Sequence, residues 1–274
     1  MGLETEHFKT LMAVKRELNG RKINPVKVLC LGYPDMVVSR AAIPVDPLVN
    51  LPAAKDSADI AKWHGWNGPV YDTNFIFKYF GIEADYIDIN ASRGIERVVD
   101  LNEEAPEDLT NKYDIVLDPG TLEHCFNIAM AFSNVISFLK RGGFVIHVNP
   151  LNLPNHGFWS LNPTAYFDFY SNNGFKVHES VLLVGPLDNR MVVKGFKPTE
   201  RFSVNMEASN MVIAEKIIDK DDLVCPMQTK YTQNPGLKLN SQPESSPMLL
   251  SPGTSSSTQT SAPTSSPPDT SAEK

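Results

Sequence analysis

The stretch YDIVLDPGTLEHCFNIAMAFSNVISFLKRGGFVIHVNP, residues 113–150, decides the fold of this chain. It opens with the nearly continuous apolar run YDIVLD (113–118), which is typical of a strand covered on both faces. Apolar residues at helical spacing then predict a helix over 126–140, and a glycine pair ends it. The apolar run FVIHV (144–148) predicts the next strand. A strand, a helix and a strand in this order predict a parallel pair joined by a right-handed crossover.

The same alternation extends in both directions from this unit. The pattern predicts further strands at 26–31, 84–89, 97–101, 175–185 and 210–217, and further helices at 5–19, 73–80 and 164–172. We therefore expect an α/β fold, with a doubly wound, mostly parallel sheet covered by helices on both faces. Residues 36–61 contain three prolines and no clear period, so we expect an irregular insertion after the first strand.

Composition excludes several classes of protein. With 42% hydrophobic residues the chain can form a sizeable core, but no run approaches the roughly 18 apolar residues of a membrane span. The start lacks a basic segment and an apolar segment, so we expect no secretory signal and a cytoplasmic protein. The three cysteines lie far apart without a CxxC pair, so we expect neither a disulfide scaffold nor a metal site. A net charge of −7 disfavours a nucleic-acid partner.

The last part of the chain differs in composition from the rest. From Ser241 to Lys274 it consists mostly of Ser, Thr and Pro, which cannot bury enough surface to offset the entropy of ordering. We expect a folded domain over residues 1–230 and a disordered tail over 231–274. The tail is either a linker, phosphorylation target or docking segment, or a solvated segment without chemistry.

Aspartates follow four of the five strands of the predicted parallel sheet: Asp35, Asp88, Asp100 and Asp118. Ligands of open parallel sheets bind outside the carboxyl ends of the strands. A carboxylate at the tip of the second strand can accept hydrogen bonds from both hydroxyls of a ribose. The turn after the third strand is suited to the edge of an adenine. The alternative is that these aspartates cap helices or form Asx turns.

The stretch 113–150 resembles the second half of class I S-adenosylmethionine-dependent methyltransferases, especially their small-molecule branch. The features in common are an acidic turn, the Leu-Glu-His that follows it, an amphipathic helix and the motif Leu-Lys-x-Gly-Gly. The similarity continues through NHGFWSLNPTAYFDFYSNNGF (155–175), so that with YIDI and VVDLN it covers about residues 84–185. NMVIAEK (210–216) resembles the family's last, antiparallel strand. The resemblance implies a Rossmann-like methyltransferase fold with a closing antiparallel strand pair, and S-adenosyl-L-methionine as cofactor.

The first motif departs from the family pattern. Gly32 matches the first glycine of the family's glycine-rich turn, but Cys30 stands where an acid is usual, and Pro34 and Met36 replace two glycines. Those glycines let the backbone approach the cofactor, and a proline offers no N–H. Either the loop takes a different path, with Asp35 holding the cofactor's ammonium group, or cofactor binding is weakened or lost.

The strand ends and the resemblance together imply a set of site residues. The cofactor-binding candidates are Gly32, Asp35, Asp88, Asp100, Leu101 and Asp118. The catalytic candidates are His124 and His156, nearest the acceptor, where an imidazole can remove a proton from a hydroxyl. Each histidine is alternatively a positioning residue. Glu123 either pairs with His124 or caps the following helix, whereas His147, inside a predicted buried strand, is expected to be structural.

A segment rich in aromatic residues, KWHGWNGP (62–69), precedes the predicted helix at 73–80. Two tryptophans around His64, bounded by glycines, are suited to a lid or an acceptor platform. The alternative is a loop whose indoles close one edge of the core.

Three functions follow from these features. The first is an S-adenosylmethionine-dependent methyltransferase that acts on a hydroxyl of a small molecule or glycan, without a membrane or nucleic-acid partner. The second is a catalytically silent methyltransferase-like binding or partner protein, which the altered glycine turn favours. The third is a nucleotide-binding Rossmann oxidoreductase, which the sequence disfavours because no GxGxxG follows the first strand.

Overall fold

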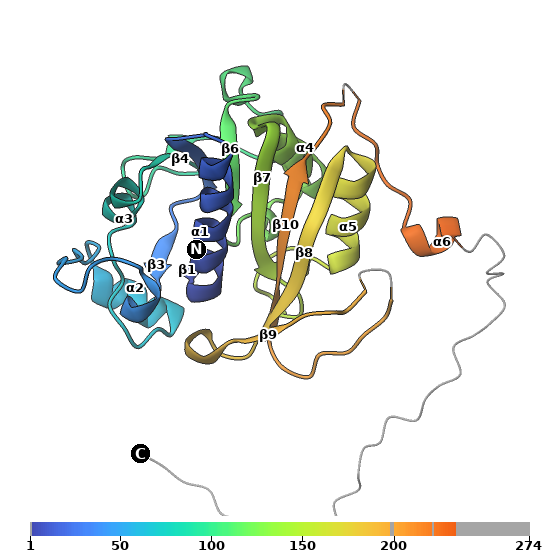
Figure 1. The fold of residues 1–274 in the computed structure, drawn as a ribbon. Helices are drawn as coiled ribbons and strands as arrows, with labels where there is room; N and C mark the ends of the chain where they lie inside the picture. Colours follow the sequence, from blue (N-terminus) through green and yellow to red (C-terminus); the bar gives the residue numbers. More distant parts are fainter. Residues whose placement is uncertain (1, 198–199, 221, 234–274) are drawn as a thin grey trace, which may run out of the picture. The chain divides into compact units, whose positions relative to one another are not determined.

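The computed structural model describes residues 2–197, 200–220 and 222–233 (Figure 1). An eight-stranded sheet has the order β5-β4-β2-β6-β7-β10-β8-β9, and a two-stranded sheet pairs β1 with β3. The strands are β1 (Gly2–Glu4), β2 (Val26–Leu31), β3 (Asp35–Val37), β4 (Ile82–Asp88), β5 (Arg97–Val98), β6 (Tyr113–Asp118), β7 (Leu139–Pro150), β8 (Phe175–Val184), β9 (Met191–Val193) and β10 (Ala208–Lys216). The helices are α1 (Thr5–Gly20), α2 (Ser57–His64), α3 (Thr73–Tyr79), α4 (Ile128–Phe138), α5 (Pro163–Asn172) and α6 (Thr229–Gln233), with 3₁₀ turns at η1 (Arg40–Ala42), η2 (Glu107–Leu109), η3 (Leu122–His124) and η4 (Leu187–Asn189).

The directions of the strands confirm the predicted architecture. The pairs from β5 to β7 are all parallel, whereas β10 is antiparallel to both β7 and β8. The sheet is therefore mostly parallel with a closing antiparallel strand, as the sequence predicted. Val28 of β2 shows the register, because it lies between Ala84 of β4 and Ile115 of β6.

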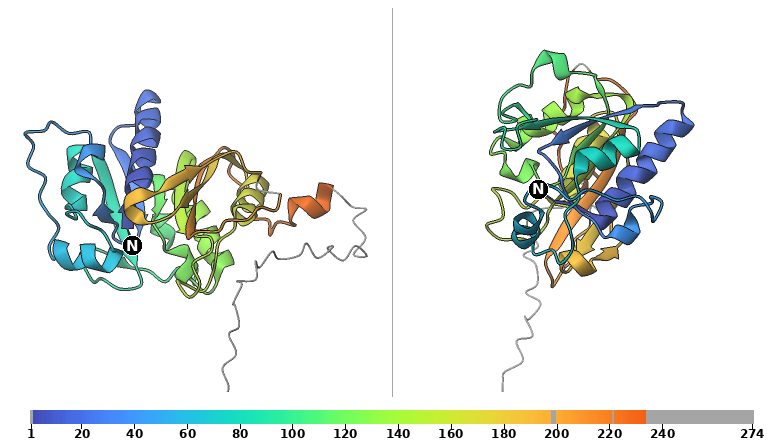
Figure 2. Two further views of the ribbon diagram at one scale, coloured as in Figure 1. Left: turned by 90° about the horizontal axis from the view of Figure 1, so that it is seen from below. Right: turned by 90° about the vertical axis from the view of Figure 1, so that its left-hand side faces the viewer.

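Helices cover both faces of this sheet. Phe8 and Leu11 of α1 pack with Ile76 of α3 in one buried cluster. Phe132 of α4 and Tyr166 of α5 belong to another, which contains the side chains of the opposite sheet face. Figure 2 shows α1 and α4 on opposite sides of the strands. Each fully buried Leu or Phe contributes about 1.5–3 kcal/mol relative to an exposed one, so these apolar stripes stabilise the three layers.

Local capping explains where two helices begin. Asp72 accepts a hydrogen bond from the backbone N of Phe75 at 2.6 Å, which satisfies one of the free donors in the first turn of α3. Pro163 occupies the first turn of α5, where its missing N–H costs nothing.

The helix predicted over 126–140 is shorter in the structure. It ends at Phe138, and β7 begins at Leu139, which pairs with Tyr113 of β6. Lys140 follows in β7, and its ammonium lies 2.7 Å from the Asp114 carboxylate of β6, which links the start of β7 to β6.

Two other predictions are corrected. The strand predicted over 97–101 is limited to Arg97–Val98, because Asp100 turns the chain by accepting hydrogen bonds from Asn102. The region 36–61 is not wholly irregular, since it contains most of β3, all of η1 and the start of α2.

The predicted tail over 231–274 lies outside the described residues, apart from residues 231–233 at the end of α6. Its disorder and the domain boundary at residue 230 therefore remain predictions. In the part of the chain that the structure describes, no helix is both long and apolar enough to cross a membrane.

Candidate functional site

The carboxyl ends of β2 and β6 meet at the switch point of the sheet. From β2 the chain continues to β4 on one side, and after β5 it returns to form β6 on the other side. The Thr121 hydroxyl, just beyond β6, donates to the Leu31 carbonyl at the end of β2 over 2.6 Å. This is the place where open parallel sheets bind ligands.

The glycine turn after β2 takes a different path from a strand-to-helix loop. Gly32 has φ +78°, a conformation that favours glycine, and its N–H donates to the Ile87 carbonyl at 2.6 Å. The chain then enters β3, and α3 begins only at Thr73, whose hydroxyl donates to the Pro34 carbonyl at 2.6 Å. The N-terminus of α3 is thus packed directly on the altered turn.

Asp35 is buried and already has two side-chain partners, a guanidinium and an imidazole. Its carboxylate lies 2.5 Å from Nη2 of Arg93 and 3.0 Å from Nε2 of His64. The Arg93 guanidinium also lies over the Tyr33 ring, 5.4 Å from the ring centre. The sequence left two alternatives, that Asp35 holds the ammonium group of a cofactor or that cofactor binding is weakened or lost. The carboxylate is suited to a cation, but an arginine from the loop after β4 is bound to it in this structure.

In the Trp-rich segment (62–69), one tryptophan closes the core and the other is exposed. Trp66 is partly buried and packs against Val37 and Ile60, closing an edge of the core. Trp63 is exposed, and its ring lies 4.6 Å from that of His64, the partner of Asp35. The segment therefore brings His64 to the strand ends, although no feature of the sequence placed this histidine there.

Asp88, at the tip of β4, has carboxylate oxygens that can still accept hydrogen bonds from a ligand. It is half-buried, and its Oδ1 accepts only a long bond of 3.4 Å from the Asn90 N–H. Among the described residues no cation pairs with it, and the next residue, Ile89, is largely exposed. A carboxylate beside an exposed apolar side chain offers acceptors for two hydroxyls and a surface for a flat base.

The turn after β5 differs from its prediction. The carboxylate of Asp100 accepts bonds of 2.8 Å from both the backbone N and the side-chain amide of Asn102, which forms an Asx turn. Leu101 is buried in the core, so its side chain does not reach a ligand at the surface. The contacts of Asp100 therefore agree with a turn-forming residue rather than with a cofactor ligand.

Asp118, a predicted cofactor ligand, is fully buried in a polar network. Its carboxylate accepts bonds from Nδ1 of His147 at 2.7 Å, from Nδ2 of Asn149 at 2.9 Å and from the Thr121 N–H at 2.8 Å. Burial opposes ionisation of Asp118, yet these bonds hold its pKa below the ordinary value. Asp118 therefore stabilises the ends of β6 and β7 from inside, and its buried carboxylate does not face a cofactor at the surface, in contrast to the prediction.

The network continues from His147 and Asn149 to two buried tyrosines. Tyr170 is hydrogen-bonded to Nε2 of His147 at 2.6 Å, and Tyr166 donates to the side-chain oxygen of Asn149. Burial raises the pKa of both tyrosines well above the ordinary value, so their hydroxyls remain protonated donors. His147 is thus held on both ring nitrogens, in agreement with the structural role expected for it.

Glu123 links this network to the two histidines predicted as catalytic. Its Oε2 accepts from the Asn149 amide at 2.9 Å, while its Oε1 lies 3.5 Å from Nε2 of His156 and 3.9 Å from Nε2 of His124. The two imidazoles are half exposed, and their ring centres are 5.5 Å apart. The neighbouring Glu123 carboxylate raises the pKa of His156, although partial burial opposes this. The structure thus brings His124 and His156 together around one buried carboxylate.

A loop packed against the backbone positions this cluster. The N–H groups of Phe158 and Trp159 donate to the Glu123 carbonyl at 2.8 and 3.3 Å. A Cβ at Gly157 would lie 2.7 Å from that carbonyl oxygen, so only glycine permits the approach. The loop after β7 and the turn after β6 therefore form one packed unit.

Exposed aromatic side chains lie on the same loops. The ring of Phe126 contacts Phe158 at 5.4 Å and Trp159 at 6.3 Å between centres, and all three are exposed. The Trp159 indole N–H is fixed by the Cys125 carbonyl at 2.9 Å. Such surfaces bind the flat or apolar faces of small molecules and sugars.

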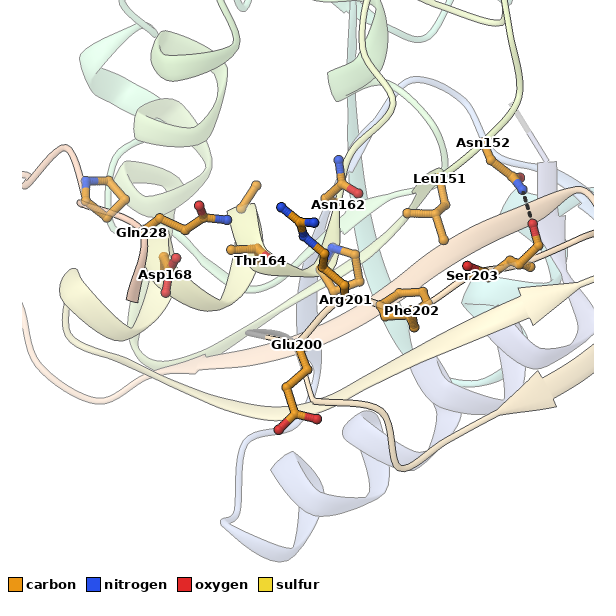
Figure 3. A pocket seen from close by; sticks show the side chains of 14 residues that line it. Leu151, Asn152, Asn162, Thr164, Asp168, Glu200, Arg201, Phe202, Ser203 and Gln228 are labelled. Atoms are coloured by element: carbon orange, nitrogen blue, oxygen red, sulfur yellow. Dashed lines mark hydrogen bonds between the residues drawn. The ribbon is translucent and has the colours of Figure 1, made fainter. Parts of the chain in front are cut away.

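A separate cavity of about 830 Å³ lies between α5, the residues after β7 and the segment 200–204. Figure 3 shows side chains that line it, among them Asn162 and Thr164 at the start of α5 and Arg201 and Phe202 of the segment 200–204. Among the described residues that line this cavity, none was predicted as a site residue. It is therefore distinct from the cluster at the strand ends.

The chain was compared with known proteins. No family model and no curated protein matches it. One similar solved structure is the citrinin polyketide synthase CMeT domain, with 12% sequence identity over 72% of this chain and 47% of that chain and a TM-score of 0.38. The CurJ carbon methyltransferase has 12% identity over 70% of this chain and 49% of that chain, with a TM-score of 0.40. The trans-methyltransferase CalH in complex with SAH has 15% identity over 73% of this chain and 53% of that chain, with a TM-score of 0.39. The chain spans about half the length of these structures. At these TM-scores the similarities decide neither fold nor activity, and the fold rests on the sheet order itself.

Proposed function

We propose that the chain is an S-adenosylmethionine-dependent methyltransferase that acts on a hydroxyl of a small molecule or glycan. The observation that carries this proposal is the placement of two unlike groups at the carboxyl ends of one parallel sheet. Asp88 offers a carboxylate for a ribose on the β4 side of β2. The Glu123, His124 and His156 cluster offers proton-accepting groups on the β6 and β7 side.

The residues present fit the adenosine part of the cofactor better than its amino-acid part. Asp88 and Ile89 provide hydroxyl acceptors and an apolar surface, as described above. Asp35 provides a buried carboxylate for an ammonium group, a place that Arg93 takes in this structure. When bound, the cofactor supplies an electrophilic methyl group on its sulfonium, so the protein mainly has to align and ionise the acceptor.

The chain's own residues would then prepare the acceptor. The exposed rings of Phe126 and Phe158 hold its apolar face and exclude water on that side. The imidazole of His156, oriented by the buried Glu123, accepts the hydroxyl proton, with His124 beside it. The acceptor oxygen that remains is the nucleophile.

The contact between Arg93 and Asp35 favours a second candidate, a methyltransferase-like protein that binds a partner without turnover. In that case Asp35 holds the loop after β4 closed and never meets a cofactor.

Calorimetric titration of the full chain separates these functions. We expect micromolar binding of S-adenosylmethionine and of S-adenosylhomocysteine, and no binding of NADH. Absence of binding of both sulfur compounds would contradict the proposal and favour the silent protein. Tight binding of NADH would instead favour an oxidoreductase.

The variant Asp88→Ala is expected to weaken S-adenosylhomocysteine binding by about 100-fold. A hydrogen bond to a charged group is worth about 1.5–3 kcal/mol, and about 1.4 kcal/mol corresponds to tenfold in affinity. The matched control is Asp100→Ala, whose carboxylate is engaged in an Asx turn, and which should bind within about threefold of the wild type. Equal losses in both variants would show that Asp88 has no specific contact with the ligand.

The variant Arg93→Ala is expected to tighten S-adenosylmethionine binding by about tenfold. The substitution leaves the buried Asp35 carboxylate with one fewer cationic partner, so an incoming ammonium no longer has to displace the guanidinium. Arg97→Ala is the control, because Arg97 pairs with the exposed Asp108 in the same part of the chain. Weaker binding by Arg93→Ala, with Arg97→Ala unchanged, would show that Arg93 binds the cofactor rather than competes with it.

A further inference from the structure

The Oε1 atom of Glu123 is a buried acceptor without a hydrogen bond. It is inaccessible to solvent, and within the described residues no donor satisfies it. A buried carboxylate oxygen without a partner is destabilising, and such atoms in native structures mark an unseen water, ion or function. Oε1 points toward the half-exposed Nε2 atoms of His124 and His156.

The three side chains have the spacing of a metal site. Their ligand atoms all lie within 4.8 Å of one another, and Oε1 is 3.5 Å from one imidazole nitrogen and 3.9 Å from the other. In a tetrahedral site with bonds of about 2.0–2.2 Å, ligand atoms are separated by roughly 3.3–3.5 Å. Small movements of two half-exposed imidazoles therefore close the site. It is the one group of this kind among the residues that the structure describes.

The carboxylate is fixed by the groups behind it. Oε2 accepts from the Asn149 amide, and that amide also donates to Asp118. Gly120 leaves room in front, because a Cβ there would lie 3.1 Å from Oε1. Hydrogen bonds of this kind to a ligand's second oxygen orient it and raise metal affinity.

We propose that Glu123, His124 and His156 bind a divalent transition-metal ion. Two imidazoles and one carboxylate suit Zn²⁺, Fe²⁺, Mn²⁺ or Co²⁺, whereas Mg²⁺ and Ca²⁺ prefer oxygen ligands throughout. Three protein ligands leave at least one coordination position open, as in catalytic rather than structural sites. This proposal replaces the expectation of no metal, which considered only cysteines.

The open position is suited to an oxygen of the acceptor, an assignment that rests on the proposed function. The exposed rings of Phe126 and Phe158 lie on the same loops and would hold the rest of that molecule. A hydroxyl bound to a divalent cation loses its proton to water more readily than a free one. Both imidazoles then act as ligands, and this replaces the role of proton acceptor given to His156 above.

The test is a titration of the metal-stripped full chain with Co²⁺ alone, followed by visible absorption, and with Zn²⁺ alone, followed by calorimetry. We expect one ion per chain and ligand-field bands of a low-symmetry site. Because even the loss of an outer-shell partner costs about 10–100-fold in metal affinity, His156→Ala and His124→Ala are each expected to weaken Co²⁺ binding by about 100-fold or more.

The matched control is His178→Ala, which removes a partly exposed imidazole beside a different carboxylate, that of Glu215 at 2.7 Å. It should bind Co²⁺ like the wild type. Glu123→Gln tests the third ligand, and its thermal unfolding is measured in parallel because this side chain is buried. The two histidine variants keep the test decisive if Glu123→Gln fails to fold.

Three results would overturn the proposal: no uptake of Co²⁺ or Zn²⁺, uptake that His156→Ala and His124→Ala leave unchanged, or an equal loss in His178→Ala. None of these measurements contains S-adenosylmethionine. A failed metal site is therefore distinguishable from a failed methyltransferase assignment, which the titrations of Asp88→Ala test.

Discussion

Replacing Asp118 with alanine is expected to lower the free energy of unfolding by about 3–5 kcal/mol. The carboxylate is fully buried and accepts bonds from His147, Asn149 and the Thr121 N–H. Its removal takes the acceptor from the buried Nδ1 of His147 and leaves the Asn149 amide with Glu123 alone. Asp118→Asn keeps the size of the side chain and one acceptor, and a smaller loss of about 1–3 kcal/mol is expected. Urea denaturation followed by circular dichroism measures both values.

The control for this prediction is Asp100→Ala. Its carboxylate is exposed and makes a local turn, so the free energy of unfolding should change by no more than about 0.5 kcal/mol. Both aspartates follow strands in the sequence, and only their burial separates them. A small effect at Asp118, similar to that at Asp100, would show that the network does not hold the ends of β6 and β7 together.

Stability is also expected to fall steeply in mild acid because of His7. This imidazole of α1 is fully buried, and neither ring nitrogen bonds to a described residue. Burial lowers the pKa of His7 from its ordinary value of 6.5 to about 3. The unfolded chain takes up a proton below about pH 6.5 while the folded chain does not. The free energy of unfolding therefore falls by about 1.4 kcal/mol per pH unit as the pH falls from 6.5 toward 3.

The variant His7→Leu should remove this contribution. Between pH 8 and pH 4.5 its free energy of unfolding is expected to fall by about 2–3 kcal/mol less than that of the wild type, as measured by urea denaturation at both values. His124→Leu, which removes a half-exposed imidazole, should retain most of the wild-type slope. Parallel curves for His7→Leu and the wild type would show that His7 is protonated or solvated in the folded chain.

Much of the fold follows from local sequence patterns. The run YDIVLD coincides with β6 residue for residue, and VKVLCL coincides with β2, because strands covered on both faces have nearly continuous apolar sequences. Helix α4 ends earlier than predicted because pairing across the sheet, as between Tyr113 and Leu139, overrides helical spacing, and β5 ends earlier because Asp100 forms a turn with Asn102.

The candidate site was only partly predictable, because its decisive contacts join distant residues. The Asp35 carboxylate is bound by Arg93, and nothing near either residue in the sequence indicates the pair. The sequence predicts that Glu123 pairs with His124 or caps the following helix, but gives no sign that it lies between His124 and His156. Asp118 looked like a ligand because a strand-end aspartate has the same local sequence whether it faces outward or inward.

A signal for the inward orientation of Asp118 was nevertheless present. Asp118 lies two residues after the buried Val116, so both side chains are on the same face of β6. The parallel register places Asp118 opposite His147. A polar residue at matching positions of two adjacent apolar strands indicates a buried pair, because a single buried charge would be too costly. The residue opposite each aspartate therefore separates the two, because Asp118 lies opposite His147 whereas Asp88 lies opposite Val98.

The most direct measurement is a crystal structure of the chain with saturating S-adenosylhomocysteine. We expect the ribose hydroxyls within hydrogen-bond distance of the Asp88 carboxylate, and the Arg93 guanidinium withdrawn from Asp35. A structure in which no ligand lies at the strand ends, with Arg93 still bound to Asp35, would contradict the proposed methyltransferase.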